Sequence, residues 1–213
     1  MASPLPPSPD GSPYQMMRPC PSCDEEPQVL ISPWMQAPER ERKTLDMAMA
    51  ERRTEEIATL SRRILSRLSA RLGRKPTDDE ALQAILDALP EVAVYRPDTP
   101  SDWDYYQFAS WTLRPRRGNA ISPWTGKPKG AGDCEDLTIL FCALALAAGL
   151  RARPKWLDQK GKLQNHFAVT TCDEAGTVCR WIEATLPGAR VGEHPYAALR
   201  RLGGAALVLG ASR

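Results

Sequence analysis

The spacing of apolar residues predicts helices in the first half of the chain. Between residues 39 and 72, apolar residues recur mostly at three- and four-residue steps, the period of one helix face. These positions are Leu45, Met49, Ile57, Leu60, Ile64, Leu68 and Leu72. We therefore expect one long helix that ends at Gly73 and spans on the order of 50 Å at ~1.5 Å per residue. A second helix should start at Thr77, which forms a capping box with Glu80, and should stop at Pro90.

The second half of the chain changes from a helical to an alternating pattern. Residues 134–148 are apolar nearly all round, which predicts a helix buried on most sides, with Gly149 at its C-terminal end. Three later segments alternate apolar and polar residues and are rich in Val, Thr and Trp, as strands are. These segments are residues 152–157, 165–172 and 178–183. A turn at 173–176 would join the last two as a hairpin, and residues 92–95 predict a short strand or an extended connector.

Proline divides the chain into an arm and a folded remainder. Ten of the 20 prolines lie within the first 38 residues, too closely spaced for a regular hydrogen-bonded element. We therefore expect residues 1–38 to form an extended arm, residues 39–90 a helical region and residues 91–213 the core domain. Composition alone favours a disordered tail for the arm. An arm held against a partner would instead suit a subunit of a larger assembly.

Composition and charge exclude several classes of protein. The 213 residues are 42% hydrophobic and 25% charged, which is ordinary for a globular protein with a real core. A net charge of +2 argues against a polybasic protein that binds nucleic acid or a membrane surface. No apolar run is long enough to predict a transmembrane helix. The first residues lack the basic and apolar regions of a secretory signal, so we expect the cytoplasm, or a virion assembled there. The basic residues of the long helix form a solvated face or dock onto an acidic partner, and both interpretations stay open.

Six cysteines in a chain without an export signal are expected to be mostly reduced. Cys20 and Cys23 form a lone CxxC pair, and Cys172 and Cys179 flank the predicted hairpin turn as possible cross-strand neighbours. These four thiolates could hold a structural zinc ion that clips the arm to the hairpin. Free thiols and a disulfide bond are the alternatives. Cys142 lies within the buried helix, where we expect it only to fill space.

Cys134 is the candidate nucleophile. It stands in the first turn of the buried helix, where free amides and the helix dipole favour a thiolate. The three acidic residues beside it oppose that ionisation, so an imidazolium partner would be needed. His166 opens one predicted strand and Glu183 lies on the next, where a carboxylate can orient the imidazole that faces the thiol.

These residues carry a resemblance to a known family. The segment Gly-Asp-Cys-Glu-Asp at 132–136, followed by an apolar helix ending in Ala-Ala-Gly-Leu, resembles the nucleophile segment of the transglutaminase-like cysteine protease superfamily. Strands with His166 and then Glu183 follow in the family's order, and Tyr-Arg-Pro-Asp at 95–98 is similar to bacterial and tailed-phage members. The resemblance covers about residues 92–190, with a Glu where the family more often has Asp.

The resemblance implies an α+β fold with a papain/transglutaminase-like core, in which the nucleophile helix packs on a small antiparallel sheet. The long helix and the Pro-rich extended arm precede this core in the chain. It implies a Cys134–His166–Glu183 triad for acyl transfer or hydrolysis of amide or isopeptide bonds in a protein or peptide, with no cofactor required. Water as acceptor would make a peptidase or amidase, and an amine a transglutaminase. The backbone amide of Cys134 can serve as one oxyanion donor. The other donor is not fixed by the sequence, and its candidates are Gln107, Trp111 and Trp124. The alternative is an assembly subunit of a phage-like particle with a catalytically silent core, which would contact its partners through the arm and the long helix.

Overall fold

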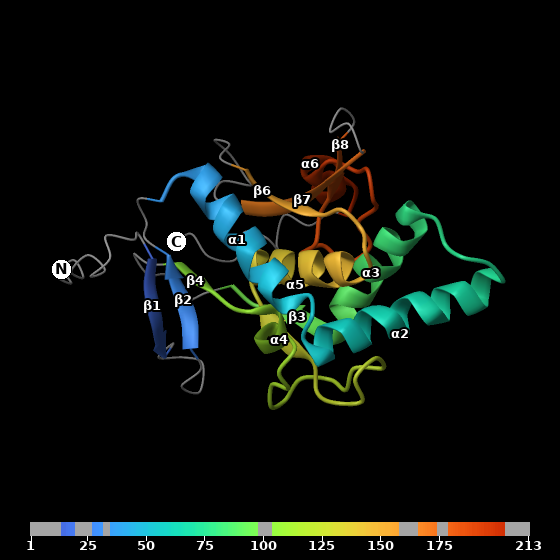
Figure 1. Ribbon diagram of the computed structural model, residues 1–213, viewed down its shortest axis with the longest axis horizontal. Helices are drawn as coiled ribbons and strands as arrows, with labels where there is room; N and C mark the ends of the chain where they lie inside the picture. The colour runs from blue at the N-terminus through green and yellow to red at the C-terminus, as the bar shows by residue number, and fades with distance from the viewer. Residues whose placement is uncertain are drawn as a thin grey trace.

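Helices and three small sheets surround a central helix, α5, in the computed structural model (Figure 1). The structure describes residues 14–19, 27–31, 35–97, 104–157, 166–173 and 179–202. The helices are α1 (Ala37–Glu51), α2 (Glu55–Leu72), α3 (Asp78–Val92), α4 (Ala109–Thr112), α5 (Cys134–Ala147) and α6 (Pro195–Arg201). The strands are β1 (Tyr14–Pro19), β2 (Pro27–Ile31), β3 (Ala93–Tyr95), β4 (Asp104–Tyr106), β5 (Gly130–Gly132), β6 (Arg153–Leu157), β7 (His166–Cys172) and β8 (Cys179–Ile182).

The central helix α5 confirms the prediction of a helix buried on most sides. Every residue from Cys134 to Ala145 is buried, and α1, α2, α3, α4 and β7 all contact the helix. Gly149 has φ 77° just beyond the end of the helix, a conformation that glycine adopts without strain. The hydrophobic core is therefore built around α5, and the residue that starts this helix is held by most of the fold.

The first two helices correct the prediction of one long helix over 39–72. The chain breaks between α1 and α2, where Thr54 is extended (φ −63°, ψ 145°) and caps the start of α2. Two acidic residues follow in the first turn of α2, where the helix dipole favours negative charge. The break lets α1 contact α5 and β6 while α2 contacts α5 and α3. Met49, placed on the apolar face by the sequence, is 39% exposed.

The capping box before α3 is confirmed. The Glu80 backbone N–H donates to Thr77 Oγ1 at 3.3 Å, and the Thr77 N–H donates to Glu80 Oε2 at 2.8 Å. The helix does not stop at Pro90 as predicted but continues to Val92. A proline in the last turn removes one backbone donor, and the helix still closes there because the Ala93 N–H donates to Leu89 O.

Two of the sheets lie beside α5 and confirm an α+β fold. The antiparallel sheet β6–β7–β8 pairs Leu157 with His166 and Val169 with Ile182. The parallel pair β3–β5 sets Tyr95 opposite Gly132, two residues before the start of α5. Strand pairing therefore brings β3, β5 and β7 to the region of the predicted nucleophile.

The arm corrects the prediction that residues 1–38 form no regular element. Strands β1 and β2 make an antiparallel hairpin, and β2 continues the sheet by pairing with β4, with Val29 opposite Tyr106. Pro19 and Pro27 stand at strand ends, where a missing N–H is tolerated. The hairpin lies on the side of the molecule near α1 and away from β8 (Figure 1).

Candidate active site

Cys134 is the first residue of α5, as the sequence predicts, and its side chain is buried. Asp133 caps the helix: its Oδ1 accepts from the backbone N–H groups of Glu135 and Asp136 at 3.2 and 3.3 Å. A helix that begins at this residue aims its free amides and positive dipole end at the thiol.

His166, the first residue of β7, and Glu183, the residue after β8, form a buried pair. His166 Nε2 lies 2.8 Å from Glu183 Oε2, and the two residues are 3% and 0% exposed. The other carboxylate oxygen, Oε1, accepts from the backbone N–H and the hydroxyl of Thr185 at 2.9 and 2.6 Å. Burial opposes ionisation of Glu183, but the histidine and the Thr185 donors outweigh it and hold the pKa of the carboxyl below its ordinary value. The carboxylate is therefore fixed and charged beside the imidazole.

The thiol has an acidic partner. Cys134 Sγ donates to Glu135 Oε2 at 2.9 Å, so this carboxylate, rather than His166, accepts the thiol hydrogen in the described residues. Burial raises the pKa of the Cys134 thiol, the negative charges of Glu135 and Asp133 raise it further, and a hydrogen bond from the Phe167 backbone opposes them. The Phe167 contact places the sulfur beside the residue that follows His166 on β7. The thiol in this arrangement is protonated at neutral pH.

Asp136 joins the helix start to the segment before α4 through contacts that the sequence did not predict. It is fully buried, and its carboxylate accepts from the Gln107 backbone N–H and the Gln107 amide Nε2, both at 2.7 Å. Its Oδ2 also accepts from the Asp133 N–H at 3.3 Å. The Gln107 side chain, a predicted oxyanion candidate, thus donates to the helix start and ties the segment before α4 to it. Gly132 leaves room for this carboxylate, because a Cβ on Gly132 would lie 2.5 Å from Asp136 Cβ.

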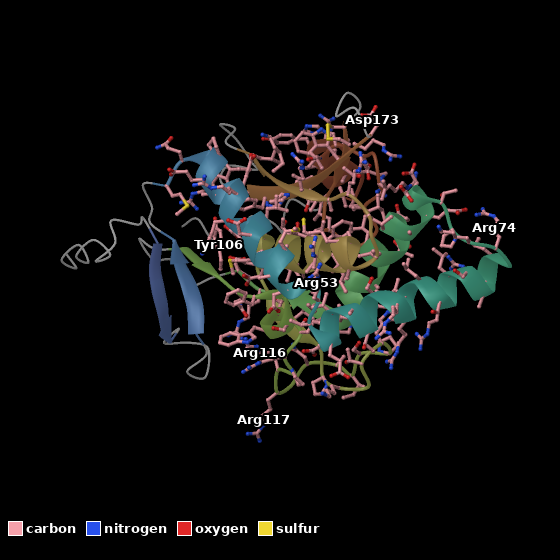
Figure 2. All side chains as sticks on the ribbon, viewed as in Figure 1. Arg53, Arg74, Tyr106, Arg116, Arg117 and Asp173 are labelled. Carbon is pink, nitrogen blue, oxygen red and sulfur yellow. A yellow bond between two sulfur atoms is a disulfide. The ribbon has the colours of Figure 1, made fainter. Side chains whose placement is uncertain are left out.

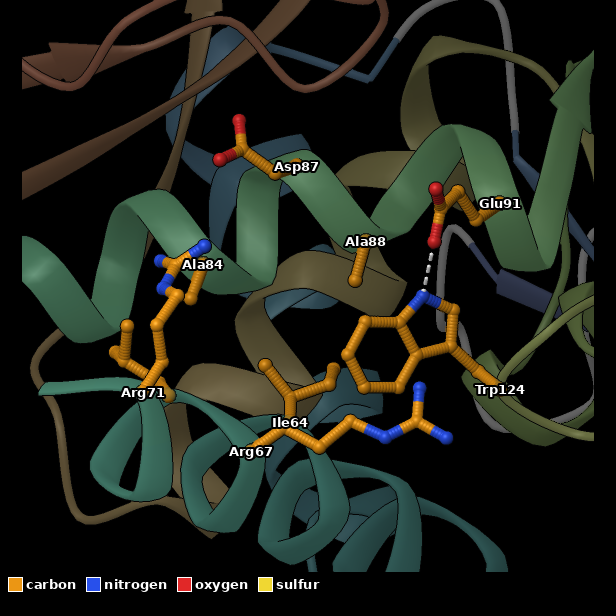
Figure 3. Close-up of a pocket in the computed structure, with 9 residues that line it drawn as sticks. Ile64, Arg67, Arg71, Ala84, Asp87, Ala88, Glu91 and Trp124 are labelled. Carbon is orange, nitrogen blue, oxygen red and sulfur yellow. Dashed lines mark hydrogen bonds between the residues drawn. The ribbon is translucent and has the colours of Figure 1, made fainter.

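Trp124, a second oxyanion candidate, contacts residues of α2 and α3. Its indole N–H donates to Glu91 Oε2 at 2.5 Å, and the Arg67 guanidinium lies 4.4 Å from the ring centroid. Figure 3 shows the indole between α2 and α3, in a pocket of about 350 Å³. Trp124 therefore anchors its loop to these helices, and its indole N–H already has a carboxylate partner. The third candidate, Trp111, is half-buried under the Arg114 guanidinium, 4.6 Å from its centroid.

The cysteines outside the site correct the zinc hypothesis. Cys172 and Cys179 are cross-strand neighbours, as predicted, and are joined by a disulfide bond, so they are not zinc ligands. Figure 2 shows this bond beside the labelled Asp173, at the outer end of the β7–β8 hairpin. Cys20 and Cys23 lie outside the described residues, and the described part of the chain has no group of three or more His, Cys, Asp or Glu side chains that could hold a metal ion. Cys142 is a free, fully buried thiol within α5, as expected.

Tyr95 is a second residue that the sequence did not mark as part of the site. Strand pairing sets it opposite Gly132, and its half-buried phenol lies near four acidic groups. Burial raises the pKa of Tyr95, and charges on Cys134, Asp133, Glu135 and Glu183 raise it further. The Tyr-Arg-Pro-Asp segment at 95–98 already resembled members of the family in the sequence, but that resemblance gave its tyrosine no role.

Comparison with known proteins gives one match. The model of the transglutaminase-like superfamily matches residues 66–199, which is more than half of the chain and includes the whole candidate site. No curated protein and no solved structure matches the chain. Within the described residues, no helix is long and apolar enough to cross a membrane.

Proposed function

Because the chain belongs to the transglutaminase-like superfamily, we propose that it is a cysteine enzyme that transfers or hydrolyses acyl groups at amide bonds. Members of this superfamily are typically cysteine-based enzymes that act on protein substrates. In this proposal Cys134 is the nucleophile, His166 the general base and acid, and Glu183 the residue that orients the imidazole.

The observation that carries the proposal is the buried contact of 2.8 Å between His166 Nε2 and Glu183 Oε2. Burying a charged carboxylate is costly unless it is paired and hydrogen-bonded, and here three hydrogen bonds meet that requirement. A carboxylate that accepts from Nε2–H leaves Nδ1 of the imidazole as the proton acceptor. This is the tautomer that a general base beside a cysteine needs.

The chemistry follows from these roles. His166 Nδ1 accepts the thiol proton, and the sulfur attacks the carbonyl carbon of an amide. The Cys134 backbone N–H, free at the helix start, stabilises the developing oxyanion. The imidazolium then donates its proton to the leaving amine, which leaves a thioester on Cys134. Water or a second amine resolves the thioester, giving hydrolysis or transamidation.

One step must precede the attack in this mechanism. The thiol that donates to Glu135 has to exchange this partner for the imidazole, because a protonated thiol beside a carboxylate is a weak nucleophile. Glu135 therefore restrains Cys134 in the described arrangement, and substrate binding has to favour the exchange.

The test compares two buried cysteines of the same helix. Cys134→Ala should abolish both peptide hydrolysis and incorporation of a fluorescent primary amine into a glutamine-rich protein, whereas Cys142→Ala should retain them. Mass spectrometry after iodoacetamide treatment should find the alkyl group on Cys134. Turnover that persists in Cys134→Ala would place the chemistry elsewhere in the protein.

A second function is favoured by the β1–β2 hairpin, whose strand β1 is an edge of its sheet among the described residues. An unpaired strand edge is a ready site for pairing with another chain. In this alternative the protein is a structural subunit of a phage-like particle with a silent core. Normal incorporation of Cys134→Ala into a particle, together with no measurable turnover by the wild type, would favour it.

A further inference from the structure

An apolar pocket lies next to the candidate active site. Its walls come from the end of α3, from β3, from α5 and from the segment that follows β8. Its volume is about 270 Å³, below the roughly 300–1,000 Å³ of sites for drug-sized ligands. The pocket is therefore sized for one large side chain rather than for a whole cofactor.

The pocket and the candidate site share residues. Thr185 lines the pocket and donates twice to Glu183. Leu137 lines it from α5, one turn after Cys134. Tyr95 lines it from β3, where it is paired with Gly132, two residues before Cys134. An occupant of the pocket would thus extend from the neighbourhood of the sulfur.

The chemistry of the walls selects the occupant. Among the described residues that line the pocket none is charged, and Tyr95 and Thr185 are its polar members. The inner wall is buried, whereas Pro187 is exposed and Val94 is half-exposed at the rim. An aliphatic or aromatic side chain would lose its contact with water here, while a lysine or glutamate would lose hydration without a partner.

We propose that this pocket is a substrate subsite for a leucine- or phenylalanine-sized side chain next to the amide that Cys134 attacks. Tyr95, which lines the pocket and is paired with Gly132 two residues before Cys134, is then a specificity-determining residue. The proposal rests on the proposed function of Cys134. It names the class of substrate: a protein or peptide segment with a large apolar residue adjoining the reacting amide.

The first test uses chloroacetyl amino acid amides, which alkylate Cys134 while presenting different side chains. The phenylalanine and leucine reagents should label Cys134 with a second-order rate constant about 10- to 100-fold above that of the glycine or lysine reagent. Val94→Phe should fill the pocket from its rim and remove this preference. Val191→Phe, at another half-buried valine outside the pocket, should retain it. Equal rates for all reagents with the wild type, or an unchanged preference in Val94→Phe, would overturn the subsite even if Cys134 proves reactive.

The second test is independent of thiol reactivity. In Cys134→Ala, N-acetyl-phenylalaninamide should shift the backbone amide NMR signals of Val94 and Leu186 at millimolar concentration, while N-acetyl-glycinamide should not. These shifts in Cys134→Ala, together with a wild-type protein that shows no turnover, would support the pocket and count against the proposed catalysis. Turnover by the wild type without these shifts in Cys134→Ala would overturn the pocket and support the catalysis.

Discussion

Replacing Glu135 by glutamine should make the Cys134 thiol more acidic. Glutamine has the same shape and keeps a carbonyl oxygen that can accept the thiol hydrogen, so the change removes mainly the negative charge 2.9 Å from the sulfur. Two unit charges at 4 Å interact by about 4 kcal/mol at an effective dielectric constant of 20. One pKa unit corresponds to about 1.4 kcal/mol. Both groups are buried, so solvent screens little of this repulsion, and we expect the thiol pKa to fall by at least about two units.

The rate of alkylation follows from this shift. A fall of about two pKa units raises the thiolate fraction of Cys134 about 100-fold at any pH where the thiol is mostly protonated in both the wild type and Glu135→Gln. The intrinsic nucleophilicity falls with a Brønsted coefficient of about 0.4–0.5, so the net gain should be roughly tenfold at neutral pH. Burial keeps the absolute rate low in both proteins, since it also raises the pKa of the thiol.

The assay is the pH profile of iodoacetamide alkylation at Cys134, followed by peptide mass spectrometry from pH 6 to 10. Glu55→Gln is the matched control, because it removes the same charge from an exposed position on α2. Near-UV circular dichroism checks that each variant is folded. A Glu135→Gln profile that coincides with the wild type, while the control also coincides, would refute the view that this carboxylate holds the thiol protonated.

Three further changes test the supports of the site. Glu183→Gln should lower stability at neutral pH. Because the pKa of Glu183 is depressed in the fold, the wild-type advantage in urea unfolding should shrink as the pH falls below about 4, and an advantage that does not shrink with falling pH would contradict the pairing. Asp136→Asn puts an amide NH₂ against the donors from Gln107 and the helix start, so the free energy of unfolding should fall by about 2–4 kcal/mol in chemical denaturation. Replacing both Cys172 and Cys179 by serine should cost about 2 kcal/mol, read as a lower Tm that reducing agent does not lower further; an unchanged Tm would show that the disulfide does not constrain the unfolded chain.

Short-range patterns in the sequence determined much of the secondary structure. The Thr77–Glu80 capping box is visible without a structure because its partners lie three residues apart. The apolar composition of residues 134–148 predicts a helix that many elements must cover, and Gly149 marks its end. Order along the chain likewise identified Cys134, His166 and Glu183 as candidates, because the cysteine begins a predicted helix, the chain has two histidines, and the carboxylate lies across the predicted hairpin.

Tertiary structure decided how the candidate side chains are used. The sequence marks Glu135 only as a negative charge beside the thiol, and only the packed helix start makes it the hydrogen-bond acceptor of Cys134. Gln107 lies 29 residues before Asp136, and folding alone turns its amide to that carboxylate. Trp124 meets Glu91 on α3 and Arg67 on α2, and only the packing of these distant segments gives its indole these partners.

Long-range strand pairing also determined the structure of the arm and the partner of Cys172. The prolines of the arm predict a break in regular secondary structure. However, β4, more than 70 residues later, provides the strand edge with which β2 pairs. The register of β7 with β8 sets Cys172 opposite Cys179, so these two sulfurs bond to each other rather than to zinc. The chain alone specifies which residues are helical, extended or able to ionise, because those preferences act over three or four residues. Which partner each side chain meets depends on the relative placement of segments far apart in the sequence, and that placement is a property of the whole packed core.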